Sequence, residues 1–310
     1  MRRLLTLICL LFLSASGLSA QPTIFENVKI RRHRSADKRV LVDKVGTLTF
    51  DDSTRKVLFK SDAGDRIDVG YDDIGKVVFE VTTHMREGAF SEVIKGVGLP
   101  GLVAGSVVAS THVKDYWFYL DYKDHDRSES VLIDVPKSSS AQVINKAQSV
   151  FGPRVTVTDF PEKGAEVKVE DLKALKSKHV LKVDKQSHPL PDVKPEKATV
   201  VVVCPPLAAR FTGKGIQFKL HANDQVIAVN KMGTYSFAYL DPGKYRLVSQ
   251  AENANGFEME LEGGHEYFFL QNTFQQTLTP NKTALSRNSP ELATYLLEGS
   301  YFSDWKPKEK

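Results

Sequence analysis

The sequence is poor in cysteine, because Cys9 and Cys204 are the only two among its 310 residues. Cys9 lies in an N-terminal segment with the features of a cleaved signal peptide, so the mature chain would keep Cys204 alone. A single cysteine excludes a disulfide within the chain and a structural metal held by several thiolates. Cys204 follows a run of valines and precedes a proline, which favours an inert buried side chain over a nucleophile.

The common catalytic signatures are missing as well. The chain contains no Gly-x-Ser-x-Gly elbow, no phosphate-binding loop and no His-Glu-x-x-His pair. One acidic group lacks the glycine and the distal bidentate carboxylate of a calcium loop, so a solvated turn is the better interpretation. Its members are Asp121, Asp124, His125 and Asp126. We therefore expect no enzyme, no cofactor and no metal, with a hydrolase-like site assembled between two modules as an open alternative.

Neither sign of charge dominates the chain. Lysine and arginine number 42 against 38 aspartates and glutamates, a net charge of +4 that falls to +2 without Arg2 and Arg3. This excess is too small to indicate a nucleic-acid partner, and we expect none.

The N-terminus carries an apolar run, Leu4–Leu13, behind Arg2 and Arg3. The run is too short to cross a bilayer comfortably, and small residues follow it as far as Ala20. We therefore predict that residues 1–20 are a signal peptide and that the protein is exported to the periplasm or cell envelope. The alternative is an N-terminal membrane anchor that is never cleaved.

Three segments of different character follow the signal peptide. Residues 22–158 show short β-rich runs and then a helical period that ends at Gly152, which predicts a curled sheet with a closing helix. Residues 159–197 are rich in lysine and proline and are predicted to be a linker with at most one short element. Residues 198–310 show short strands and a terminal helix after Ser289, which indicates a β-sandwich. The predicted fold class is thus mainly β (α+β).

An alternating aromatic stretch stands out in the last segment. Tyr235, Phe237 and Tyr239 share one face of a strand because strand side chains alternate. We expect this face to belong to the sandwich core, and an exposed strip that stacks on sugars or peptides is the alternative. The structural turn that follows is predicted to be of type II and to lead into a hairpin partner strand. Its residues are Asp241, Pro242 and Gly243.

Five short motifs are found along the C-terminal segment: Cys204-Pro205, Gly233-Thr234-Tyr235, Asp241-Pro242-Gly243, Gly264 and Tyr267-Phe268-Phe269. Through these motifs, residues 198–280 resemble the bacterial domain of unknown function 2846 family. The resemblance implies a prealbumin-like or carboxypeptidase-regulatory-like sandwich and no particular activity.

The N-terminal segment has a set of hairpin residues followed by a predicted helix: Gly46, Leu48, Phe50, Leu58, Phe59, Tyr71, Ile74 and the helix at 139–151. In these features it is similar to pleckstrin-homology and GRAM-like domains. The resemblance implies opening hairpins, a closing helix, and lipid or peptide binding in some members.

Two further stretches are candidate contact sites. A basic cluster before the first clear hairpin is a candidate for anionic headgroups or phosphates, although a charged strand edge is the more ordinary interpretation. The cluster comprises Lys29, Arg31, Arg32, Arg34, Lys38 and Arg39.

The second stretch, 96–113, has no side chain that is ionised at neutral pH and contains several glycines. A buried loop against the first module, a shallow membrane contact and a membrane span are its three interpretations. The candidate membrane-contacting residues are Leu99, Leu102 and Val103.

Together these features predict an exported, non-catalytic adaptor protein of the cell envelope. We expect its partner to be a protein, a peptide or an envelope component. A membrane-surface protein that uses the basic cluster and the glycine-rich stretch is the first alternative, and the hydrolase-like enzyme is the second.

Overall fold

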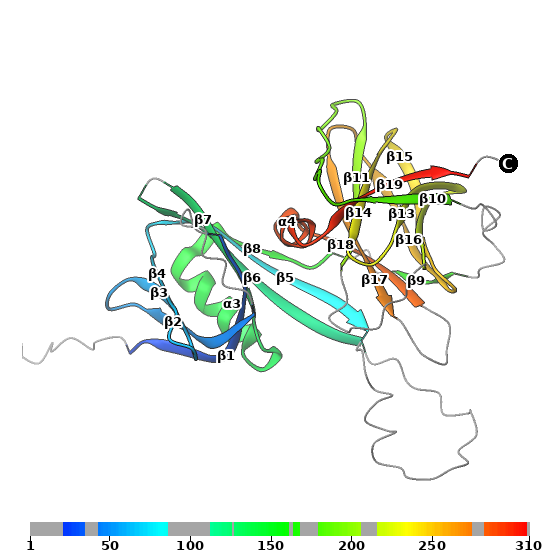
Figure 1. Ribbon diagram of the computed structural model, residues 1–310. Helices are drawn as coiled ribbons and strands as arrows, with labels where there is room; N and C mark the ends of the chain where they lie inside the picture. The colour runs from blue at the N-terminus through cyan, green and yellow to red at the C-terminus, as the bar shows by residue number, and fades with distance from the viewer. Residues whose placement is uncertain are drawn as a thin grey trace, which may run out of the picture. The chain divides into compact units, whose positions relative to one another are not determined.

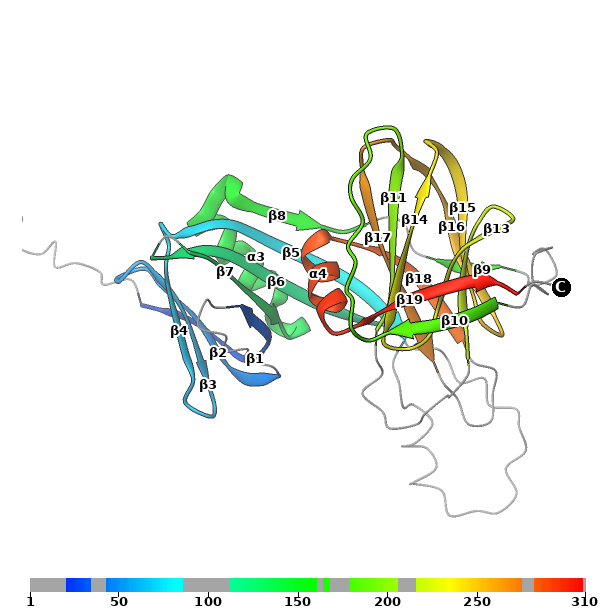
Figure 2. The same cartoon turned by 45° about the horizontal axis from the view of Figure 1, so that its top comes forward.

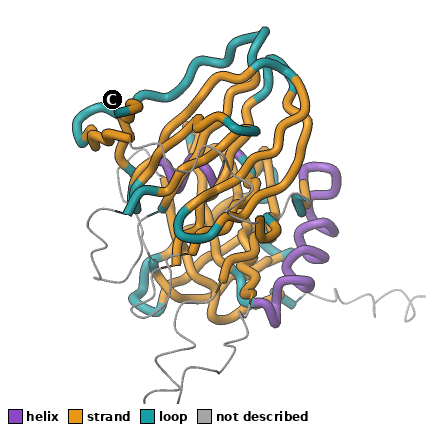
Figure 3. Tube along the Cα trace, turned by 90° about the vertical axis from the view of Figure 1, so that its right-hand side faces the viewer, coloured by secondary structure: helices purple, strands orange, loops and turns teal. Residues whose placement is uncertain are grey.

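The computed structural model describes residues 21–34, 43–85, 112–125, 127–160, 164–167, 179–205, 216–274 and 282–308 (Figure 1). The chain divides into two compact units, one of Met1–Phe79 with Phe118–Thr156 and one of Glu80–Trp117 with Val157–Lys310. Strands make up most of the described trace (Figure 3). The predicted mainly β fold is confirmed.

The first unit is built on an eight-stranded sheet with the order β4-β3-β2-β1-β7-β6-β5-β8. Strands β5, β6 and β8 each continue from this unit into the second. The elements are β1 (Thr23–Arg34), β2 (Lys44–Asp51), β3 (Lys56–Ser61), β4 (Arg66–Gly70), β5 (Ile74–Met85), β6 (His112–Asp124), β7 (Arg127–Asp134), α3 (Lys137–Phe151), a 3-10 turn (Gly152–Arg154) and β8 (Val155–Thr158).

Alternating side chains form the core of the first unit. Leu48 and Phe50 of β2 are fully buried, whereas Thr49 between them is only partly covered. The Phe50 ring lies 6.4 Å from Phe118 and 6.2 Å from Phe151, within the usual range for aromatic pairs. The helix α3 buries Val143, Phe151 and the residues between them that lie on the same face, so the predicted closing helix is present.

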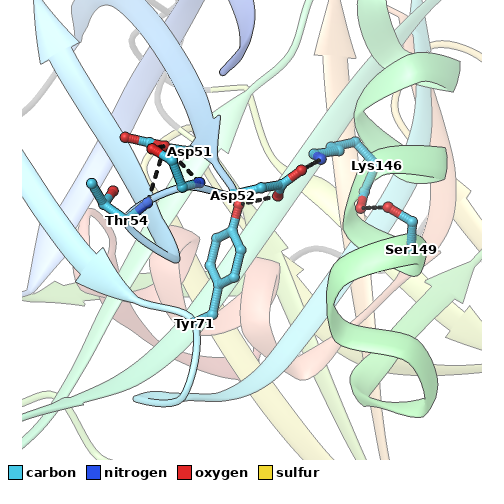
Figure 4. A network of polar contacts seen from close by, with 7 residues as sticks. Asp51, Asp52, Thr54, Tyr71, Lys146 and Ser149 are labelled. Carbon is cyan, nitrogen blue, oxygen red and sulfur yellow. Dashed lines mark hydrogen bonds and ion pairs between the residues drawn. The ribbon is translucent and has the colours of Figure 1, made fainter. Parts of the chain in front are cut away.

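A polar network joins the turn between β2 and β3 to α3 (Figure 4). Asp52 accepts a hydrogen bond from the Tyr71 hydroxyl at 2.9 Å and lies 2.5 Å from the Lys146 ammonium group. Its neighbour Asp51 accepts from the backbone N–H groups of Ser53 and Thr54, and hydrogen bonds from both residues hold the pKa of Asp51 at about 2. These contacts are satisfied among themselves, so the network has a structural role.

The second unit is a β-sandwich (Figure 2). Its six-stranded sheet has the order β10-β19-β14-β11-β17-β18, and its five-stranded sheet has the order β13-β12-β15-β16-β9. The elements are β9 (Ala165–Val167), β10 (His179–Asp184), β11 (Ala198–Cys204), β12 (Phe218–Ala222), β13 (Gln225–Asn230), β14 (Thr234–Leu240), β15 (Gly243–Gln250), β16 (Ala254–Leu261), β17 (Glu266–Phe274), β18 (Lys282–Asn288), α4 (Pro290–Glu298) and β19 (Tyr301–Pro307).

Strand β11 is buried on both faces. Val200 and Val202 point into the main core between the two sheets, whereas Val201 and Val203 join a smaller cluster with Ala293 and its neighbours on α4. A continuous apolar strand is the pattern expected for a strand covered on both sides. Cys204, at the end of β11, is fully buried and outside any disulfide.

The predicted position of the aromatic stretch is wrong in one respect. Tyr235 and Phe237 lie in the smaller cluster with α4, on the outer face of the six-stranded sheet, whereas Ala238 and Leu240 pack on the main core. Alternation predicts which side chains share a face but not which face is the interior. The helix α4 provides the second apolar cover that makes the outer face favourable.

The predicted turn after this stretch also differs from the structure. β14 pairs with β11 in one sheet, while β15 pairs with β12 and β16 in the other, so Asp241 and Pro242 carry the chain between sheets and do not close a hairpin. Gly243 is the first residue of β15 and has a φ of 153°, far from the value of about +80° at the third position of a type II turn.

The predicted linker, residues 159–197, contributes strands to the sandwich. β9 pairs with β16, and all six residues of β10 pair with β19. These are short strands at the sheet edges, and the lysines and prolines around them give the region the composition of a solvated connection. The helix predicted after Ser289 is present as α4, capped by the Ser289 side chain, and the chain continues beyond it into β19.

Candidate binding surface

Four aromatic side chains lie together on the outer face of the six-stranded sheet. We call them the aromatic face: Tyr235, Phe237 and Tyr239 of β14, and Phe302 of β19. The ring of Phe302 lies 5.6 Å from Tyr235 and 5.7 Å from Phe237, and Phe237 lies 5.9 Å from Tyr239. Aromatic pairs attract at these separations. The strand period explains the grouping, since every second residue of β14 is aromatic.

The segment that joins β10 to β11 runs beside the aromatic face (Figure 2). We call residues 185–197 the strap. The Tyr235 hydroxyl donates a hydrogen bond to the Pro189 carbonyl at 3.0 Å. The Asp192 backbone N–H donates to the Tyr239 hydroxyl at 3.2 Å. Two tyrosine hydroxyls therefore hold backbone groups of the strap.

Two lysines add charge to this contact. The Lys194 ammonium group lies 4.0 Å from the centre of the Tyr239 ring, which is the geometry of a cation–π interaction. The Lys197 ammonium group lies 2.6 Å from the Asp241 carboxylate, and that hydrogen bond raises the pKa of Lys197. The raised pKa keeps Lys197 protonated and attracted to Asp241 at neutral pH.

Burial along the strap is uneven. Pro189 and Pro191 are half-buried, whereas Leu190 and Val193 expose 68% and 49% of their surface. Tyr301, at the start of β19, exposes 44% and lies 6.2 Å from the His188 ring. The strap is therefore held through its prolines and backbone, while large apolar side chains around it face solvent.

The Tyr235 hydroxyl is a permanent donor in this site. Burial raises the pKa of Tyr235 to about 12, and Asp184 adds to the effect. A phenol with this pKa stays protonated over the physiological range, so the hydrogen bond to the strap does not depend on pH there.

A second polar group lies inside the sandwich. Gln271 donates to the Ser249 hydroxyl at 2.9 Å, and Ser249 and Thr283 share a hydrogen bond of 2.6 Å. His221 is fully buried and bonds to the Gln250 amide oxygen at 2.8 Å. Burial lowers the pKa of His221, and its amide partner is neither a nucleophile nor an acid–base group. This arrangement stabilises the interior and does not form a catalytic pair.

The basic cluster predicted from sequence is partly neutralised. Arg31 binds the carboxylates of Asp43 at 2.7 Å and Asp134 at 2.9 Å, and Lys29 lies 3.2 Å from Asp43. These two cations are committed to internal partners. The side chains of Arg32 and Arg34, and both Lys38 and Arg39, lie outside the described residues.

The other predicted sites have different outcomes. Leu99, Leu102 and Val103 lie outside the described residues. Within the described ranges, no group of three or more His, Cys, Asp or Glu residues could hold a metal, and no helix is long and apolar enough to cross a membrane. The exposed side chains of Asp124 and His125 lie 2.7 Å apart, and their exposure agrees with a solvated turn. Asp126 is not described.

Sequence reasoning missed the strap, because its prolines were interpreted only as a linker signal. The spacing Pro189-x-Pro191 opposite an aromatic strand is a signal that could have suggested it, since proline-containing chains dock on aromatic side chains. A scan of the chain against protein-family models finds no match, and a search of curated proteins finds no relative either.

Proposed function

We propose that this chain is an exported, non-catalytic adaptor protein of the cell envelope that binds its partner through the aromatic face and the strap. The observation that carries the proposal is the group of large apolar side chains exposed around the strap, namely Leu190, Val193 and Tyr301. Exposed apolar side chains that gather in one place on a soluble module are typical of an interaction site. The signal-peptide features of residues 1–20 support export.

The chemistry of this surface suits binding without reaction. Aromatic rings supply contact area at a small cost in side-chain entropy, and tyrosine hydroxyls supply directional hydrogen bonds. The sandwich resemblance and the likeness of the first unit to pleckstrin-homology and GRAM-like domains both support a binding protein, because such folds carry many non-catalytic functions.

The proposal is tested by sedimentation of the mature chain with isolated cell-envelope fractions from a bacterium. Replacing Leu190, Val193 and Tyr301 together by serine is expected to reduce the sedimented fraction about tenfold, because three apolar anchors are lost. The matched control replaces Ile24, Val45 and Val157, which are also exposed, by serine. Equal losses in both variants, or no sedimentation of the wild type, would contradict the proposal.

A membrane-surface role predicts a different result with lipid vesicles. Because Lys29 and Arg31 are already paired with carboxylates, we expect the mature chain to stay in the supernatant with anionic vesicles, and Arg31→Ser to change nothing. Co-sedimentation that weakens at high salt would instead support the membrane-surface function, since exposed charge attraction is screened over about 8–10 Å at physiological ionic strength.

A further inference from the structure

The strap makes its contacts with groups that any extended peptide can offer. The Pro189 carbonyl and the Asp192 N–H belong to the backbone, and each meets a tyrosine hydroxyl. Proline has no backbone N–H, so the half-buried Pro189 and Pro191 leave no donor unsatisfied in this contact. The aromatic face therefore recognises the form of an extended proline-containing chain more than particular side chains.

We infer that the aromatic face is a docking surface for an extended proline-rich peptide of a partner protein, and that the strap occupies this surface in cis. The inference rests on the proposed binding function: the partner peptide replaces the strap on the aromatic face, and the exposed Leu190 and Val193 of the displaced strap stay available for contact with the partner. Peptides of this kind lose little conformational entropy on binding, because proline already favours an extended conformation in the free state. Aromatic side chains are the usual lining of surfaces that bind them.

The register of the strap defines the sequence that a partner would carry. Residues Pro189, Asp192 and Lys197 meet Tyr235, Tyr239 and Asp241 in the same order, so the strap runs parallel to β14. With Lys194 above the Tyr239 ring, the strap has the pattern Pro-x-Pro-x-x-Lys. A partner peptide with this pattern would reproduce the backbone hydrogen bonds and the cation–π contact, and a second basic residue at the position of Lys197 would add the charge attraction to Asp241.

The contacts of Asp192 and Lys194 lie near solvent, whereas Tyr235 is fully buried and the Lys197 carbonyl accepts the Gly264 N–H at 2.9 Å, so displacement must begin at the middle of the strap. Lys194 and Asp192 are exposed, and Asp241, the partner of Lys197, is also open to solvent. Because the strap is tethered at both ends, its effective concentration at the face is high, of the order of millimolar for short connections. A peptide in trans must overcome this competition, so we expect the wild-type chain to bind it weakly and a chain with a weakened strap to bind it well.

The experiment uses the mature chain, residues 21–310, and a fluorescent synthetic peptide with the sequence of residues 186–197. Replacing Pro189 and Pro191 by serine in the protein is expected to tighten binding of the peptide about tenfold, measured by fluorescence anisotropy. A peptide in which its own three prolines are replaced by serine is expected to bind at least tenfold more weakly than the natural sequence.

A matched pair of tyrosine variants, each made in the chain with the weakened strap, locates the site. Tyr239→Phe removes the hydroxyl that accepts the Asp192 N–H and is expected to weaken peptide binding about five- to tenfold. Tyr267→Phe is the control, because its hydroxyl accepts the Glu262 N–H at 2.9 Å in the same unit but away from the aromatic face. Equal effects of the two variants, or equal binding of the two peptides, would overturn the inference.

A measurement on the unmodified chain keeps the test independent of variant folding. If the natural peptide displaces the strap, it should accelerate tryptic cleavage after Lys185, at the exposed start of the strap, in a concentration-dependent way, and the serine peptide should not. Unchanged cleavage, together with no binding to the chain with the weakened strap, would show that the strap is a permanent part of the module. In that case envelope binding that still depends on Leu190, Val193 and Tyr301 would leave the proposed function intact.

Discussion

Gly256→Ala is expected to lower the free energy of unfolding of the second unit by about 3 kcal/mol and to lower its melting temperature accordingly. A Cβ atom at this position would lie 2.2 Å from the Leu247 carbonyl oxygen and 2.8 Å from the Val248 Cα atom. Both are backbone atoms of the neighbouring strand β15, which pairs with β16 at this point. Neither can rotate away as a flexible side chain would, so the two strands must separate.

The measurement is the thermal or urea-induced unfolding of the mature chain, followed by circular dichroism. Gly299→Ala is the control, because the nearest atom to its Cβ would be the Leu296 carbonyl oxygen at an ordinary 3.7 Å. That variant should change stability by no more than about 1 kcal/mol. An unchanged melting temperature for Gly256→Ala would mean that β15 and β16 are not as close as described.

The second large effect is expected at Glu80, a carboxylate buried within the second unit. Its oxygens accept from the Ser289 N–H at 3.1 Å, from the Ser289 hydroxyl and from the Asn288 amide at 3.3 Å. Glu80→Ala would remove the acceptor of these buried donors, and a donor that finds no other partner costs about 1–3 kcal/mol. We therefore expect a loss of about 2–4 kcal/mol in the unfolding free energy of this unit.

Glu80→Gln keeps the size and shape of the side chain and removes its ionisable group. Burial raises the pKa of Glu80 above its ordinary value of 4.5, so the folded state holds a proton that the unfolded state releases. The contribution of Glu80 to stability must then fall as the pH rises from about 4.5 to the raised pKa, and stay lower above it. The glutamine variant has no such proton, so the wild type should lose stability relative to this variant over the window. The lowered pKa of His221 makes stability rise with pH in both proteins and cancels from the comparison.

Urea titrations from pH 4 to pH 8 test this expectation. The control is Glu129→Gln, which changes another buried glutamate, in the first unit, where the carboxylate accepts from the Tyr122 hydroxyl at 3.0 Å. A glutamine variant with the same pH dependence as the wild type would contradict the role given to Glu80.

The strands of the first unit could be predicted because local patterns decide them. Leu48 and Phe50 alternate with polar residues and stand opposite Phe59 and Val57 in the β2–β3 ladder. The closing helix follows from the 3.6-residue spacing of Val143, Ala147 and their neighbours. In the second unit, the valine run of β11 predicts a strand covered on both faces, and Ser289 with Pro290 predicts the start of α4.

The candidate site could not be predicted because it depends on distant segments. Tyr235 and Pro189 are 46 positions apart, and nothing local to either residue indicates that they meet. The strands of the predicted linker were not predicted for a related reason, since β10 is stabilised by its pairing with β19 and not by a pattern within its own sequence. The burial of Glu80 could have been predicted, because Glu80 is the one acidic residue within the apolar run Val77–Val81. Such a position is typical of a buried carboxylate with partners.

Alkylation of Cys204 can report the opening of the second unit. Its sulfur is fully buried at the end of β11, the strand between β14 and β17, and it is the only thiol in the described residues. A thiol reagent can reach it only when the sandwich opens, so the rate of alkylation measures the opening free energy of that unit alone. The same reaction can follow the variants at Gly256 and Glu80 without any added label, because each opening event is recorded as one covalent mass increment.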